Sequence, residues 1–512
     1  MKTGFVCSAL LVFLMNQNLL GATPDSDTIN AKIRNAAGKT VLLEPRTYII
    51  DATIAVNIDG TRLSGSRETI LKIKDNANLE KMIRISQRNC VIQGIALDGN
   101  RSSNACSQAT YAIAVENTTG DTFSIRGFVI DGIKITNTKD HGIGIGTNNV
   151  HNGKIINCFI ENTGGNGILV NPHAYDLSIS GNVIGRTLSQ NNIFVRGSGM
   201  DGASSITITH NICDSAADVG IEVGNTFRGV HDRIIVSDNF ITRPVNAGIF
   251  FRSVNNGQIS NNTIYNAGNT NYGEDGIFIT GDFDQNRNVD ITANTIVMRD
   301  QTFAGNGGAG IHVTAYKDVL ASHNSIKSGG TGILLEGETN GIRDLDSVSL
   351  KNNTISNAAT GIKMGGRNRI RDIFIDSNTI QWVTRGIQCS VHDTSGHASR
   401  IIMNRNEIRT CKTVGILLYN TKEAVLSNNV FIDCAFANNH SDDEATAVML
   451  SSCKGIRALN TTVEATESGE HQMKWAFSQR NCAGIEIAGL SIKGASIGAI
   501  DTVGKTNPFK KR

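Results

Sequence analysis

The sequence predicts an all-β solenoid in which one coil of three short parallel strands repeats along most of the chain. One phrase keeps returning between about residues 120 and 435: an alternating run, Asn-x-Ile, a short spacer and Gly-Ile-x-Val. The Gly positions of this phrase are 22 to 34 residues apart, for instance 28 between Gly220 and Gly248. Each repeat holds period-2 segments of strand length and no pattern of helix length. Such segments bury their apolar sides best by stacking in register on the next coil.

Residue parity within the repeat predicts which side chains form the core. The Ile and Val of Gly-Ile-x-Val are expected inside, and the Gly before them is expected to mark a tight turn. The recurrent Asn is expected at a fixed turn, where it adopts a left-handed conformation and its amide bonds the same residue of the next coil as a ladder. The recurrent residues are Asn157, Asn182, Asn211, Asn239, Asn262, Asn294, Asn324, Asn353, Asn378, Asn406 and Asn429.

These repeats resemble the parallel β-helix repeats of the pectate-lyase-like superfamily. The earlier segments TVLLEPRTYII, ILKIKD and CVIQGIALDGN resemble the N-terminal coils of that superfamily, so the resemblance runs from roughly Thr28 to Lys493. It implies a right-handed parallel β-helix and a protein that handles polysaccharides. It does not select a reaction, because lyases, hydrolases, epimerases, esterases and phage tailspikes share the scaffold.

The first 22 residues have the pattern of a secretory signal peptide. One Lys precedes an apolar run from Val6 to Leu14, and small residues end at Ala22. A buried N-terminal helix is the alternative. The expected organisation is a signal peptide at 1–22, a cap and first coils at 23–120, the main β-helix at 121–500 and a basic tail at 501–512. No later stretch is apolar enough to span a bilayer, so we expect a secreted or periplasmic protein.

The charge balance excludes a general attraction to nucleic acid or to membranes. The formal net charge is +2, from 48 Lys+Arg and 46 Asp+Glu. The expected partner is therefore a polysaccharide met locally, by a monomer or a trimer. Without Cys7 the chain has nine cysteines and no CxxC spacing, so we expect buried thiols with no more than one or two disulfides.

Candidate functional residues follow from the outward positions of the Gly-Ile-x-Val strands, which are x and the residue two later. Neighbouring rungs lie about 4.8 Å apart, so these positions form two columns on the surface. Over five central rungs the columns hold aromatic, cationic and acidic side chains: Phe194, Arg196, Glu222, Phe250, Arg252, Phe278 and His312. Aromatic faces beside Arg and carboxylates suit sugar rings that bear acidic groups. The candidate catalytic residues are Arg196, Glu222, Arg252, Asp275 and His312, and the candidate substrate-binding residues are His173, Phe194, Phe250, Tyr272, Phe278 and Lys363.

Loop lengths indicate the same central stretch. The spacing from the ladder Asn to the next Gly grows to 14 residues between Asn262 and Gly276 and to 16 between Asn294 and Gly310. Loops of this length, carrying Tyr265, Tyr272 and Glu274, are expected to wall a groove. The alternative is that each outward Phe packs under a loop and that Glu222 is an ordinary solvated carboxylate.

Two weaker signals adjoin the columns. Asn171-Pro172-His173 resembles the Tyr-Gly-x-Asp-Pro-His segment of alginate C5-epimerases but lacks the catalytic Tyr and Asp, so only His173 is carried over, as a groove residue. The Gly281-Asp282-Phe283-Asp284 loop could hold Ca²⁺, although two carboxylates in a loop are usually solvated. No other cofactor is expected, and His210 and His323, which precede ladder Asn residues, are expected at turns.

Three functions remain open from the sequence. A lyase on a uronate polysaccharide, the favoured one, would use Arg196 or Arg252 to neutralise the carboxylate, with His312, His173 or a second Arg as the base. An inverting glycoside hydrolase would use Glu222 and Asp275, two rungs or about 9 to 10 Å apart along the axis. A carbohydrate-binding adhesin or tailspike-like fibre would use the Phe residues without chemistry.

Overall fold

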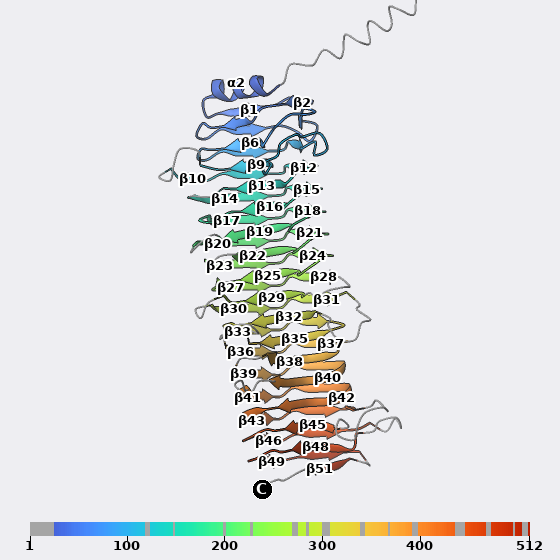
Figure 1. Ribbon diagram of the computed structural model, residues 1–512. Helices are drawn as coiled ribbons and strands as arrows, with labels where there is room; N and C mark the ends of the chain where they lie inside the picture. The colour runs from blue at the N-terminus through green and yellow to red at the C-terminus, as the bar shows by residue number, and fades with distance from the viewer. Residues whose placement is uncertain are drawn as a thin grey trace, which may run out of the picture.

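The structure is a computed structural model, and it describes residues 25–117, 123–146, 149–197, 201–225, 229–268, 275–282, 286–299, 308–337, 344–366, 369–391, 398–435, 446–466, 473–494, 497–503 and 510–511. These residues form a right-handed parallel β-solenoid, confirming the predicted fold class. The coils stack from the N-terminal helix α2 (Ser26–Ala36) at one end to β51 (Gly498–Val503) at the other (Figure 1). The predicted signal peptide at 1–22 lies outside the described residues.

Each coil contributes one strand to each of three faces. The ladder face precedes the recurrent Asn, and its central strands are β14 (Val150–Ile156), β17 (Tyr175–Ser180), β20 (Asp201–Thr209), β23 (Val230–Ser237), β27 (Gly257–Ser260), β30 (Arg287–Thr292), β33 (Lys317–Ser322), β36 (Leu345–Lys351), β39 (Ile370–Asp376), β41 (Ala398–Asn404) and β43 (Thr421–Ser427). The lateral face follows that Asn, with β15 (Phe159–Glu161), β18 (Val183–Gly185), β21 (Ile212–Asp214), β24 (Phe240–Thr242), β28 (Thr263–Ala267), β31 (Thr295–Met298), β34 (Ser325–Lys327) and β37 (Thr354–Ser356).

The groove face carries the Gly-Ile-x-Val segments. Its central strands are β13 (His141–Ile145), β16 (Ile168–Val170), β19 (Ile193–Gly197), β22 (Ile221–Asn225), β25 (Ile249–Arg252), β29 (Ile277–Thr280), β32 (Ala309–Thr314), β35 (Thr331–Glu336) and β38 (Thr360–Gly366). The groove and lateral faces join in one sheet because β40 (Thr379–Val391) and β42 (Glu407–Tyr419) run around the corner between them.

The core is a set of aliphatic columns, as the parity predicted. The two inward positions of the groove face are fully buried in β19, β22 and β29. The Gly before them is required by crowding rather than by a turn, which corrects the expectation. A Cβ at Gly248 would lie 2.7 Å from the carbonyl oxygen of Gly276 and 2.6 Å from a methyl group of Ile264. Both distances are shorter than real Cβ contacts allow.

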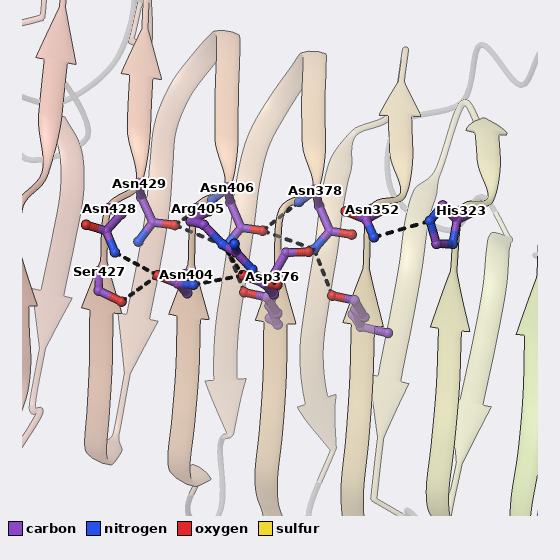
Figure 2. Close-up of polar contacts among 12 residues, drawn as sticks. His323, Asn352, Asp376, Asn378, Asn404, Arg405, Asn406, Ser427, Asn428 and Asn429 are labelled. Atoms are coloured by element: carbon purple, nitrogen blue, oxygen red, sulfur yellow. Dashed lines mark hydrogen bonds and ion pairs between the residues drawn. The ribbon is translucent and has the colours of Figure 1, made fainter.

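The Asn ladder forms as predicted from Asn182 to Asn429. In each step the Oδ1 of one Asn accepts hydrogen bonds from the backbone N–H and the Nδ2 of the preceding ladder Asn, at 2.9–3.0 Å between Asn262 and Asn294. The Nδ2 of Asn294 also donates to the carbonyl of Ile259 at 3.0 Å. Figure 2 shows this continuous chain from Asn378 through Asn406 to Asn429. All ten of these amides are buried.

Two details of the ladder prediction are wrong by one residue. Asn157 lies one position before the ladder, and Cys158 occupies the ladder position of that coil, where its N–H donates to Asn182 Oδ1 at 2.9 Å. The left-handed residue is the one before the ladder Asn, for example His210 (φ 56°) and His323 (φ 57°), so both histidines hold the expected turn role.

The two ends of the solenoid are closed differently. Ile29 and Ile33 of α2 are fully buried and cover the first coil. At the other end β51 crosses the predicted boundary at residue 500 and pairs with β48 (Trp475–Arg480), so the start of the predicted basic tail continues the sheet. The nine cysteines from Cys90 to Cys482 are free thiols and all are buried. No helix within the described ranges is long and apolar enough to span a membrane.

Candidate functional site

The groove face brings the predicted column residues together in the predicted register. Along the x column Phe194 pairs with Glu222, Glu222 with Phe250, Phe250 with Phe278, and Phe278 with His312. The column continues through Leu334 to Lys363. The second column runs from Arg196 through Gly224 to Arg252 and on to Glu336.

The centre of the x column is a stack of three rings. The centroids of Phe250 and Phe278 are 5.0 Å apart with an interplanar angle of 5°. The imidazole of His312 continues the stack at 4.6 Å from Phe278 with an angle of 19°. Parallel strands hold identical positions one rung apart, so the rings stand face to face on the surface. The three side chains are half-buried and offer an apolar wall to the adjoining cavity.

His312 lies between two carboxylates. Its Nδ1 is 2.9 Å from Asp275 Oδ2, and its Nε2 is 3.3 Å from Glu336 Oε2 and 2.9 Å from the Thr314 hydroxyl. Burial disfavours the imidazolium, but the hydrogen bonds and charges of Asp275 and Glu336 outweigh it and raise the pKa of His312 to about 9. The His312 bond in turn lowers the pKa of Glu336, against its burial. His312 is therefore protonated at neutral pH.

Asp275 reaches this triad from the turn before β29. It is 8% exposed, and its Oδ1 accepts the backbone N–H of Ala309 at 2.7 Å while its Oδ2 faces His312. The residues at the same turn position one coil before and after are Ala247 and Ala309. A charged side chain between two alanines leaves space on both sides of the carboxylate.

Glu222 is the second buried carboxyl of the groove face. Its Oε2 accepts a hydrogen bond from the Asn191 amide at 2.6 Å. A Cβ at Gly224 would lie 2.7 Å from Glu222 Oε1, so that glycine makes the room in which the carboxyl folds over the strand. Burial is the main cause that raises the pKa of Glu222 to about 7; the Asn191 bond opposes it, and the negative charge of Asp218 adds to it.

A cavity of about 290 Å³ connects these groups. Its wall contains three carboxyl side chains and the first two stacked rings: Asp218, Val219, Glu222, Asn246, Ala247, Phe250, Asp275 and Phe278. Glu222 and Asp275 thus share one cavity across two rungs, with the Phe rings between them. A protonated carboxyl, an aromatic wall and further carboxylates in one hollow are the parts that acid–base chemistry on a sugar requires.

The predicted arginines are placed differently from one another. Arg252 forms a bidentate ion pair with Asp282, at 2.8 and 3.2 Å, so its charge is compensated within the protein. Arg196 is exposed and forms no ion pair with any described residue. Asp282 belongs to the loop considered for Ca²⁺, whose Phe283 and Asp284 lie outside the described residues. In the part of the chain that is described, no three acidic, His or Cys residues are arranged to hold a metal ion.

The remaining candidates lie at the margins of the site or elsewhere. Phe194 is one rung before Glu222, and Lys363 is two rungs beyond His312. His173 is exposed in the turn after β16, with a φ of 64°. Tyr272 and Glu274 fall outside the described residues. Tyr265 is not in the groove wall as expected, because it belongs to β28 on the lateral face.

Sequence reasoning missed three residues that complete the site. Glu336 stood in the second column, but nothing in the sequence showed that His312 would lean toward it. Asp218 and Asn191 sit in the turns before their Gly-Ile-x-Val strands, where no repeat position marks them as functional. Their one signal was proximity to Glu222 in the coil, through the same turn column that holds Asp275.

Comparisons with known proteins identify the fold. A family model described as the right-handed beta helix region matches residues 341–508. No curated protein matches the chain. The crystal structure of the pre-mature bacteriophage phi29 gene product 12 aligns with 98% of this chain and 75% of its own at 12% identity, with a TM-score of 0.51.

Two further solved structures share the coil at lower similarity. The DFA-IIIase from Arthrobacter chlorophenolicus A6, in complex with DFA-III, is 12% identical over 66% of this chain and 91% of its own, with a TM-score of 0.44. The mannuronan C-5 epimerase AlgE6 A-module from Azotobacter vinelandii is 12% identical over 96% of each chain, with a TM-score of 0.25. At these identities the likeness speaks for the fold alone. The chain is a right-handed parallel β-helix protein.

Proposed function

We propose that this protein is a carbohydrate-active enzyme that hydrolyses glycosidic bonds of a polysaccharide lying along the groove face. The observation that carries the proposal is Glu222, a buried carboxyl whose pKa is raised to about 7 in a cavity walled by Phe250 and Phe278. A carboxylic acid that keeps its proton near neutral pH is the general acid that glycoside hydrolysis requires.

In the proposed reaction Glu222 donates its proton to the glycosidic oxygen as the bond from that oxygen to the anomeric carbon breaks. Asp275 accepts a proton from a water molecule whose oxygen forms the new bond on the opposite face of the ring. The two residues lie two rungs apart, about 9 to 10 Å along the axis. This separation leaves room for the water and favours inversion over retention, in which the carboxyls are about 5 Å apart.

His312 and Arg252 support hydrolysis better than elimination. A lyase needs a neutral base, but the pKa of His312 is raised to about 9 between Asp275 and Glu336, so the imidazole is already protonated. A lyase also needs a cation for the uronate carboxylate, and the charge of Arg252 is compensated by Asp282. In the hydrolase His312 holds Asp275 in place and balances its charge. Exposed Arg196 remains the cation that a lyase would use.

The activity test uses the full chain with a panel of alginate, pectate, glycosaminoglycans, sulfated galactans and neutral glucans. We expect new reducing ends without the ultraviolet absorbance of unsaturated uronates. The product anomer, read by proton NMR at early times, is expected to be inverted. Absorbance rising together with reducing ends would overturn hydrolysis in favour of the lyase. A retained anomer would reassign the second carboxylate from Asp275 to Asp218.

The pH profile tests the role of Glu222. Because only the protonated carboxyl can donate, kcat/KM should fall as pH rises above about 7. A Glu222→Gln variant should lose the activity, while the matched Glu464→Gln variant, on β47 (Thr462–Glu464) far along the solenoid, should keep both activity and profile. A polysaccharide substrate also implies export, so we propose a secreted or periplasmic location, which cell fractionation tests.

A further inference from the structure

A second hollow lies on the lateral face, away from the groove. Four apolar side chains stand in register on consecutive strands β15, β18, β21 and β24, with Phe159 against Val183, Val183 against Ile212 and Ile212 against Phe240. Their exposed fractions are 40% for Phe159, 37% for Val183, 44% for Ile212 and 46% for Phe240. The column spans three rung intervals, about 14 Å. It ends in polar residues on both sides, at Lys134 and Thr263.

The neighbouring outward column turns this stripe into a concave site. The third position of the same strands holds Glu161, Gly185, Asp214 and Thr242, and Tyr265 follows on β28. A Cβ at Gly185 would have no atom within 4 Å, so this position is an open gap between Glu161 and Asp214. The two columns enclose a cavity of about 540 Å³ that contains Phe159, Phe240, Tyr265 and Arg243.

The charges at the edge of this cavity are balanced within the protein. Arg243 donates two hydrogen bonds to Asp214, at 3.0 and 2.6 Å, and the Thr242 hydroxyl donates a third at 2.5 Å. The planar guanidinium and the carboxylate still have free edges for hydroxyl groups, since each side chain is partly exposed. A charged ligand would have to compete with this pair, whereas a neutral polyhydroxyl ligand would not.

We propose that this hollow is a second carbohydrate-binding site, which takes a neutral glycan chain and holds the protein on its polymer without cleaving it. The apolar faces of sugar rings would lie on Phe159, Ile212 and Phe240, and sugar hydroxyls would bond the Asp214–Arg243 pair. The site does not depend on hydrolysis in the groove, because no residue is shared between the two.

The dimensions favour a glycan over a second copy of this chain. A volume of about 540 Å³ falls in the usual range of small-ligand sites, roughly 300–1,000 Å³. A stable protein interface buries about 800 Å² on each partner. One column of four apolar side chains bounded by Lys134 and Thr263 is narrow for such an interface.

The test is affinity electrophoresis of the full chain through gels that contain soluble β-glucan, xylan, galactomannan or levan. A Glu222→Gln background prevents cleavage. We expect retardation by at least one polymer, and a loss of about tenfold in affinity in the Phe159→Ala/Phe240→Ala double variant, since each aromatic stack contributes about 0.5–1.5 kcal/mol. Ile402→Ala removes an equally exposed apolar side chain from the ladder face, 42% exposed, and should leave retardation unchanged.

A groove variant separates this proposal from the proposed function. Phe250→Ala should reduce hydrolysis yet keep the gel retardation that the lateral site produces. Retardation lost in Phe250→Ala but kept in the double variant would overturn the second site and leave the groove as the binding surface. Retardation by none of the four polymers would also overturn it. A wild-type oligomer that the double variant dissociates in sedimentation velocity would assign the hollow to a second copy of the chain.

Discussion

The ladder corner and the groove face are both rows of polar side chains on the same coils, yet they differ in how those side chains are satisfied. In the ladder each interior Asn gives and receives the same four hydrogen bonds as its neighbours, as Asn294 does with Asn262, Asn324 and Ile259. In the groove each rung holds a different residue, and Glu222 keeps a single side-chain bond, from Asn191, for its buried carboxyl. Repetition marks the polar groups that hold the coils together, and departure from it marks the groups that are poised to react.

The largest expected effect comes from removing the groove carboxyl. Glu222→Gln keeps the shape and the Asn191 contact but cannot donate a proton, so activity should fall by about 10²- to 10⁴-fold. Its stability should move the other way. The folded pKa is raised to about 7, so wild type loses stability as pH rises from about 4.5 through 7, and at pH 8 the variant should be more stable by up to about 3 kcal/mol.

Kinetics and urea unfolding of the same preparation check both halves of that prediction. Glu464→Gln, which loses a partly exposed ion pair with Lys493, is the control and should change neither activity nor stability appreciably. A Glu222→Gln variant that is less stable than wild type at pH 8 would show that the carboxyl is structural, and would remove the contrast with the ladder.

The ladder should respond in the opposite sense. Asn294→Ala leaves the Asn262 amide, the Ile259 carbonyl and the Asn324 Oδ1 without partners inside the core, so it should destabilise the fold by about 3 kcal/mol. Activity per folded molecule should remain. Asn157→Ala, one position outside the ladder with a partner bond only to Asp131, should cost less than about 1 kcal/mol. Equal costs in urea unfolding would mean that the ladder bonds do not set stability.

This contrast also explains what the sequence could predict. The fold was predictable because Asn294 and Gly248 recur in their neighbours at fixed spacing, and a repeated constraint leaves a repeated letter. The column registers followed too, since Phe250 and Phe278 occupy the same parity of successive strands. Only the reasons differed in places: the Gly is needed where the next coil's carbonyl comes too close, and the left-handed residue precedes the ladder Asn.

The electrostatics of the site could not be predicted from spacing. Glu222 was an acidic letter in a column, but its raised pKa depends on how far its carboxyl folds over Gly224. His312 was a candidate base until Asp275 and Glu336 were found on either side of it, which makes it a cation. The direction in which a side chain leans is set by contacts between coils, and the sequence order does not encode them.

The His312 triad sharpens the comparison through pH. Its folded pKa is raised from 6.5 to about 9, so the stability that it contributes is complete below about pH 6.5 and is lost as pH rises through 9. The loss should be about 2 kcal/mol, and it should be absent from a His312→Gln variant when the two are unfolded by urea between pH 7 and 10. Parallel curves for the two proteins would show that the imidazole is neutral, which would return it to the list of possible bases.

The smallest effect is expected where the ladder stops. Asn429 is followed in the next coil by Thr461, whose hydroxyl is buried with no hydrogen-bond partner among the described residues, and the Asn429 amide donates only to the Met403 carbonyl. Thr461→Asn places an Oδ1 where each earlier coil has one, so it should accept from the Asn429 amide and stabilise the protein by about 1 kcal/mol. Thr461→Val, which removes the hydroxyl without extending the ladder, is the matched control and should gain less. If thermal unfolding ranks Val above Asn, the benefit lies in removing an unpaired hydroxyl, and the ladder's order contributes nothing beyond its individual bonds.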